Sequence, residues 1–349
     1  MEKYEEYGYN IQNGKVIIPE WETEIKEGAF EDCSNLTSVS IPPSVTQIGY
    51  DAFKGCSSLA SVSIPPSVTK IGAYAFSECS SLANISIPPS VTEIGDYAFS
   101  GCSGLASISI PPSVTKIGYY AFSECSSLAN ISIPPSVTQI GHDAFTGCSS
   151  LANVSIPPSV TQIDNWVFSD CPSLASIIVS KGNKVYDSRE DCNAIIHTES
   201  NTLISGCKNT IIPPSVTEIG EFAFSGCSGL ASISIPPSVT KIGDYAFSEC
   251  SSLANISIAP SVTEIGEMAF ALCKSLRSIT IPDSVAVIGK WAFAGCESLT
   301  ELRIPESVRD IGFSSFSACE NLTKVWIPTD CYLDRNDFEH CLHVQIIRY

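Results

Sequence analysis

The sequence predicts a β-rich solenoid, in which short coils of one chain stack along an axis and share a continuous core. One observation behind this prediction is that apolar residues recur at fixed positions, so that each unit reads like the segment from Cys56, CSSLASVSIPPSVTKIGAYAFSE. One such coil cannot bury its own apolar face, whereas about fourteen stacked copies can. The second observation is that cysteines recur every 23 residues, at Cys33, Cys56, Cys79, Cys102, Cys125, Cys148 and Cys171, then at Cys227, Cys250, Cys273, Cys296 and Cys319.

Each coil is expected to begin with a short strand whose side chains alternate between the core and solvent. In the unit from Cys56, the apolar residues Leu59, Val62 and Ile64 face inward and the serines between them face outward. The pair Pro65-Pro66 then ends the strand, because proline cannot donate a hydrogen bond to a β-ladder.

The second half of the coil is expected to hold another short extended piece and a turn. Residues 68–71 form the extended piece, which ends at Gly72, where the permissive backbone angles of glycine predict a turn. Ala75, Phe76 and Cys79 then have the spacing of a single helical or 3₁₀ turn that buries all three side chains.

The register of the repeat breaks once, because Cys171 and Cys227 lie ten residues further apart than two regular units require. Within the break, residues 193–198 and 202–207 predict a β-hairpin. The hairpin either presents a contact loop or fills the stack as an irregular repeat. The predicted organisation is one solenoid, residues 1–349, with an N-terminal cap at 1–30, repeats at 31–179, an irregular island at 180–210, repeats at 211–328 and a C-terminal cap at 329–349.

The cysteines that recur once per coil predict a ladder of buried free thiols, because free cysteine behaves as a small apolar side chain. Cys192 and Cys207 flank the hairpin and could pair, and Cys331 and Cys341 in the C-terminal cap leave the same question open. His340, His343 and the two cap cysteines have the residue types of a zinc site, but their spacing matches no strong zinc motif. Packing of the cap is therefore the expected role, and no metal or cofactor is predicted.

Composition and motifs argue against several classes of function. A net charge of −18 disfavours nucleic acid and anionic membranes as partners, and membrane insertion is not expected, because no stretch reaches the ~18 apolar residues of a spanning helix. No glycine-rich phosphate loop is present. None of the four histidines, at His142, His197, His340 and His343, belongs to a nucleophile or metal motif, so an enzyme is not expected.

The unit SIPPSVTxIGxYAFxxCSSL resembles the BspA-like class of leucine-rich repeats, also called the Treponema pallidum type, over residues 14–328. The resemblance implies a leucine-rich-repeat solenoid and a surface adhesin that binds extracellular-matrix proteins, host cells or other bacteria. It also implies a cell-surface or secreted location. Residues 1–10 are acidic and polar and lack the pattern of a signal peptide, so a cytoplasmic location stays open.

The outward positions of the first strand form the natural binding face of such a solenoid. They are mostly serine and asparagine, but near the C-terminus they become Glu301 and Arg303, then Lys324 and Trp326. An exposed tryptophan with neighbouring charges is typical of a binding hot spot, so these four residues are the candidate partner-binding residues. The alternative is that the last coils simply diverge near the cap.

A row of aromatic residues follows the Ile-Gly turn and offers a second candidate surface. Stacked aromatic rings one coil apart could bind a partner, a sugar or a flat ligand, although they more often pack on one another. The row contains Tyr74, Tyr97, Tyr120, Trp166, Phe222, Tyr245 and Trp291, and is interrupted at Asp143 and Met268. The expected function is therefore non-enzymatic binding of a protein or glycan in adhesion, and the alternative is a structural spacer or scaffold without a specific site.

Overall fold

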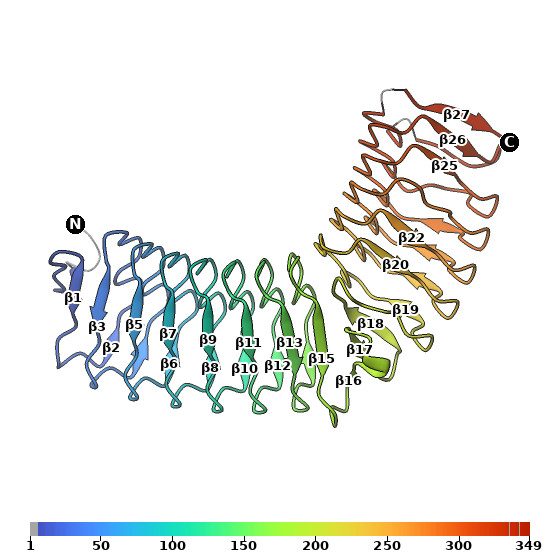
Figure 1. The fold of residues 1–349 in the computed structure, drawn as a ribbon. Coiled ribbons are helices and arrows are strands. Elements are labelled where there is room, and N and C mark those ends of the chain that lie inside the picture. The colour runs from blue at the N-terminus through green and yellow to red at the C-terminus, as the bar shows by residue number, and fades with distance from the viewer. Residues whose placement is uncertain (1–5, 335, 342) are drawn as a thin grey trace. The chain divides into compact units, whose positions relative to one another are not determined.

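The computed structural model describes residues 6–334, 336–341 and 343–349 (Figure 1). The chain divides into two compact units, Met1–Cys171 with Ser180–Asn183, and Pro172–Val179 with Lys184–Tyr349. Each unit is a stack of short coils, as the labels and colours of Figure 1 show. The predicted β-solenoid of leucine-rich type, with coils of roughly 23 residues, is confirmed.

The first strands of successive coils in the first unit form one parallel sheet. Partners lie one coil apart, so that Ser61 pairs with Asn84 and Ser63 with Ser86. These strands, in spatial order, are β1 (Lys15–Ile17), β3 (Ser38–Ser40), β5 (Ser61–Ser63), β7 (Asn84–Ser86), β9 (Ser107–Ser109), β11 (Asn130–Ser132) and β13 (Asn153–Ile156).

The short strands that precede each turn form a second parallel sheet in the first unit. They are β2 (Glu24–Ile25), β4 (Gln47–Ile48), β6 (Lys70–Ile71), β8 (Glu93–Ile94), β10 (Lys116–Ile117), β12 (Gln139–Ile140) and β14 (Gln162–Ile163).

Among its described residues, the second unit contains three sheets. The first has the order β16-β17-β18-β19-β21-β23-β24, and the others are β20-β22 and β25-β26-β27. The elements are β15 (Ser176–Val179), β16 (Tyr186–Asp187), the 3₁₀ segment η1 (Arg189–Asp191), β17 (Ile195–His197), β18 (Thr202–Ser205), β19 (Glu218–Ile219), β20 (Ser232–Ser234), β21 (Lys241–Ile242), β22 (Asn255–Ser257), β23 (Glu264–Ile265), β24 (Val287–Ile288), β25 (Glu301–Arg303), β26 (Lys324–Ile327) and β27 (Gln345–Arg348).

The core follows the predicted alternation. Leu59, Val62 and Ile64 are buried, while Ser61 and Ser63 are exposed. One phenylalanine per coil stacks on that of the next coil, with ring centroids 5.2 Å apart for Phe30–Phe53 and 5.6 Å apart for Phe145–Phe168. Each coil therefore completes the core of its neighbour, as expected for a solenoid.

The turn after the second strand differs from its prediction in two respects. Gly72 is required for close packing of backbones rather than for unusual angles, because an added Cβ would lie 2.7 Å from the carbonyl carbon of Gly49 in the preceding coil. The left-handed residues are instead Tyr74 (φ 57°) and Glu78 (φ 60°). The amides of Ala75 and Cys79 bond to carbonyls three residues back, as in a 3₁₀ turn. The left-handed residues between these bonds prevent a continuous helix.

From Lys184 onward, the irregular island is built into the stack of the second unit. The predicted hairpin is confirmed, since β17 and β18 pair antiparallel, and β18 pairs in parallel with β19 of the next coil. Ile195, Ile196 and Leu203 are fully buried. This packing favours an irregular repeat over a protruding contact loop.

The cysteine ladder is buried as predicted, and most of its thiols donate a hydrogen bond to a carbonyl oxygen of the preceding coil. Cys102 Sγ donates to the carbonyl oxygen of Phe76 at 3.1 Å, and Cys125 Sγ donates to Phe99 at 3.2 Å. No disulfide links cysteines in the part of the chain that the structure describes. Cys192 and Cys207 donate instead to the carbonyl oxygens of Ala194 and Asn193, respectively.

Candidate binding surfaces

Most of the outward face of the first sheet in the first unit carries small polar side chains at regularly repeating positions. From β3 to β13 its exposed side chains are serine and asparagine on successive strands, such as Ser107, Ser109, Asn130 and Ser132. Such small polar side chains lack the aromatic and arginine anchors that dominate binding energies.

The strand face changes at the C-terminal end of the second unit, where β25, β26 and β27 pair in parallel. Glu301 lies opposite Lys324, and Arg303 lies opposite Trp326. The structure therefore brings together all four residues proposed from the sequence. Lys324 Nζ lies 3.8 Å from Glu301 Oε1, and both side chains are exposed to solvent.

Arg303 is held by a residue that sequence reasoning missed. Its guanidinium lies 4.7 Å from the ring centroid of Tyr349, whose hydroxyl donates to the carbonyl oxygen of Ile304 at 2.7 Å. Trp326 is only half-buried rather than exposed as expected, because β27 adds a strand beside β26 and places Ile347 opposite it. We call Glu301, Arg303, Lys324, Trp326 and Tyr349 the β25–β27 patch.

A depression of about 380 Å³ adjoins the β25–β27 patch. It forms where residues 277–281 have an irregular backbone in place of a regular strand. The depression is lined by Ile279, Thr280, Ile281, Pro282, Asp283, Arg303 and Pro305. Arg303 thus belongs both to the patch and to the wall of the depression.

The aromatic row at the turns packs largely on itself. Ring centroids are 4.3 Å apart for Tyr74–Tyr97, 4.6 Å for Tyr97–Tyr120 and 4.7 Å for Phe222–Tyr245. These rings are half-buried, so they shield the edge of the core. Burial and a hydrogen bond to the Asp143 carboxylate raise the pKa of Tyr120 to about 12.

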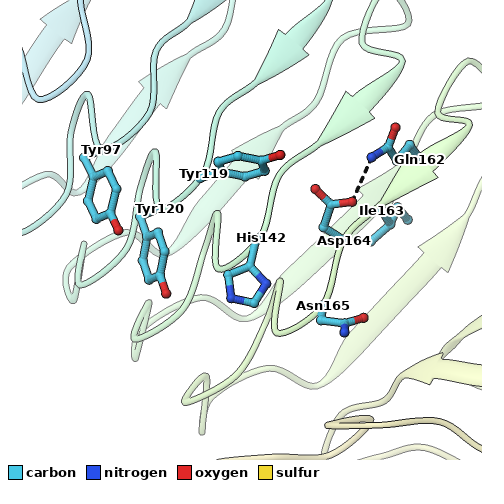
Figure 2. A pocket seen from close by; sticks show the side chains of 8 residues that line it. All are labelled: Tyr97, Tyr119, Tyr120, His142, Gln162, Ile163, Asp164 and Asn165. Atoms are coloured by element: carbon cyan, nitrogen blue, oxygen red, sulfur yellow. Dashed lines mark hydrogen bonds between the residues drawn. The ribbon is translucent and has the colours of Figure 1, made fainter.

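A pocket of about 560 Å³ lies where Asp143 interrupts the row in the first unit (Figure 2). Its lining combines aromatic rings with amide and carboxylate groups, from Tyr97, Tyr119, Tyr120, His142, Gln162, Ile163, Asp164 and Asn165. The sequence marked Asp143 as a break in the row but gave no sign of a pocket, because its lining comes from four different coils.

Among the described residues, no group of three or more His, Cys, Asp or Glu side chains is arranged to hold a metal ion. Likewise, within that part of the chain, no helix has the length and apolar character needed to span a membrane.

Comparison with known proteins gives a family match along the chain. A family model described as "BspA type Leucine rich repeat region (6 copies)" matches residues 4–129, 69–196, 200–323 and 250–349. A search of curated proteins gave no match.

Solved structures share the fold. A leucine-rich cell surface protein from Faecalibacterium prausnitzii is 30% identical with a TM-score of 0.74, over 98% of this chain and 92% of that one. A leucine-rich repeat protein from Bacteroides ovatus is 31% identical with a TM-score of 0.59, over 98% and 97% of the two chains. The pneumococcal vaccine antigen PcpA is 21% identical with a TM-score of 0.66, over 98% and 86%, a likeness of fold alone.

Proposed function

Because the chain belongs to the BspA-type leucine-rich repeat family, we propose that it is a non-enzymatic recognition module that binds a protein partner at the cell surface. The F. prausnitzii protein, which is similar over nearly the full length of both chains, is described as a cell surface protein. The β25–β27 patch is the proposed contact site, and adhesion is the proposed consequence of contact.

The observation that carries this proposal is the pairing of Arg303 with Trp326 on β25 and β26, with the ring of Tyr349, which follows β27, against Arg303. Arginine, tryptophan and tyrosine are the residue types that most often dominate the binding energy of protein interfaces. The stack on Tyr349 holds the Arg303 side chain in place, so less conformational entropy is lost on binding. The ion pair of Lys324 with Glu301 is exposed and contributes little by itself, about 0–1 kcal/mol, so it forms the polar rim.

We predict that Arg303→Gln weakens binding to a protein partner at least tenfold, a loss of about 1.4 kcal/mol or more. Biolayer interferometry on immobilised fibronectin, laminin, fibrinogen and collagen measures this, with circular dichroism to confirm the fold. The matched control is Arg277→Gln, which removes an exposed arginine of the same unit outside the patch.

The alternative function is a structural spacer, which requires no specific contact. A spacer would bind none of the four proteins, or would bind them equally well with Gln at position 303. An equal loss in the Arg277→Gln and Arg303→Gln variants would show a general effect of charge and would contradict the proposed site.

A further inference from the structure

Two neighbouring coils of the first unit depart from the repeat at the same place. Most coils carry an aromatic residue two positions after the turn glycine, as in Gly95-Asp96-Tyr97. The coil after Tyr120 has Asp143 at that position, and the following coil replaces the glycine itself by Asp164. Both changes line or support the pocket in Figure 2.

Asp143 ends the aromatic stack and orients a histidine in its place. Its φ of 54° matches the 57° of Tyr97 and the 53° of Tyr120, so the side chain, and not the backbone, creates the gap. Asp143 is only 4% exposed; its carboxylate lies 2.8 Å from His142 Nε2 and accepts a hydrogen bond from Thr146 Oγ1 at 2.8 Å. The His142 ring consequently lies between the rings of Tyr120 and Trp166. Its centroid is 5.7 Å from the ring centroid of Tyr120 and 4.7 Å from that of Trp166.

Asp164 separates the coils slightly and supplies a carboxylate to the wall of the pocket. Where glycine occupies this position its amide lies close to the preceding coil, and the inter-coil bond from Gly141 N to Ile117 O is 2.9 Å long. The equivalent bond from Asp164 N to Ile140 O lengthens to 3.1 Å. Gln162 Nε2 donates to Asp164 Oδ1 at 2.9 Å and so fixes the carboxylate, as the dashed line in Figure 2 shows.

The pocket presents an aromatic side and a polar side. Tyr119 is 46% exposed, its amide is anchored by Asp96 Oδ1 at 2.8 Å, and Lys116 Nζ lies 6.0 Å from its ring centroid. Across from the tyrosines, Asp164 can accept hydrogen bonds, while Asn165 can both donate and accept them (Figure 2). The volume of about 560 Å³ falls within the roughly 300–1,000 Å³ of small-molecule sites.

We infer that this pocket binds a neutral saccharide residue. A pyranose has one apolar face of C–H groups, which packs on an aromatic ring, and a rim of hydroxyls that need both acceptors and donors. The carboxylate of Asp164, in a chain of net charge −18, disfavours anionic sugars. This site lies in the first unit and takes a ligand of another class, so it goes beyond the protein-binding function proposed for the β25–β27 patch.

The test is saturation-transfer-difference NMR of the full chain with methyl glycosides of glucose, galactose, mannose and N-acetylglucosamine. We expect saturable transfer to at least one glycoside and at least tenfold weaker binding in Tyr119→Ala and in Asp164→Asn. The matched control is Tyr50→Ala, because Tyr50 follows the turn glycine of its own coil, is 45% exposed and lies outside the pocket. Binding in Tyr50→Ala should equal that of the wild type.

A filling variant adds an independent test. Asp143→Tyr restores the aromatic residue that the backbone of this position accepts in neighbouring coils, so the chain should fold and lose saccharide binding. The inference is overturned if no neutral glycoside shows transfer, if a sialoside binds more tightly than all four, or if Tyr119→Ala binds like the wild type. Equal losses in Tyr119→Ala and Tyr50→Ala would overturn it too. Binding of the Arg303→Gln variant to glycosides should be unchanged, which separates this outcome from that of the protein-binding test.

Discussion

Replacing Gly289 by alanine should destabilise the second unit by about 3 kcal/mol. An ideal Cβ at this position would clash with Glu267 N and with the carbonyl carbon of Gly266. These are backbone atoms of the preceding coil, and Gly289 N is tied to that coil by a 2.8 Å hydrogen bond to Ile265 O. The coils must therefore separate, and the phenylalanine stack they share must loosen.

Urea unfolding followed by circular dichroism measures this loss, with Gly295→Ala as the matched control. Gly295 has a φ of 70°, and the same turn position is occupied by Leu272 (φ 59°) and Ala318 (φ 55°) in neighbouring coils. Alanine is thus accommodated there, at about 1 kcal/mol for its left-handed backbone. If Gly295→Ala costs as much as Gly289→Ala, close approach of the coils is not the reason for the recurring glycine.

Raising the pH above the ordinary thiol pKa of 9.0 should destabilise both units steeply. Burial raises the pKa of Cys102, Cys125 and Cys148 in the first unit, and of Cys250 in the second, well above that value, so these thiols stay protonated while the chain is folded. In the unfolded chain they ionise near their ordinary pKa. The unfolded state then binds fewer protons than the folded state, so stability that is complete below about pH 9 is lost as the pH rises, by about 1.4 kcal/mol per thiol and pH unit.

Urea titrations at about pH 8 and about pH 10 test this, with Cys102→Ala as the reference. At the lower pH, Cys102→Ala should be less stable than the wild type because the substitution leaves a cavity. Its free energy of unfolding should, however, fall less steeply with pH, because one ionising thiol fewer contributes to the slope. Tyrosine and lysine side chains titrate in the same way in the wild type and in Cys102→Ala, so their contributions cancel in the comparison. Identical slopes for the two proteins would show that the Cys102 thiol does not stay protonated in the folded chain.

Much of the fold follows from one unit of sequence, because every internal coil offers the same environment to the same residue. The alternation of Leu59, Val62 and Ile64 with serine is enough to orient the strand, and the recurrence of Phe76 and Cys79 is enough to place them in the core. The reason for Gly72 could not be found in this way, since the atoms it avoids belong to the coil 23 residues earlier.

The sites are less accessible to sequence reasoning than the fold. Glu301, Arg303, Lys324 and Trp326 were found because they replace serine and asparagine at repeating positions. A closing strand near residues 343–347 is expected from the sequence, but its pairing opposite Trp326 is not, because this segment no longer follows the repeat. The pocket beside His142 could not be found from the sequence, because it depends on two residues in separate coils, Asp143 and Asp164, that shape the same part of the surface.

Display at the cell surface is the part of the proposed function that a single measurement tests most directly. An antibody against the chain should label intact, unpermeabilised cells of the organism that makes it, and brief protease treatment of those cells should remove the label. Label that appears only after the cells are lysed, and that survives protease on intact cells, would contradict a role in recognition at the surface.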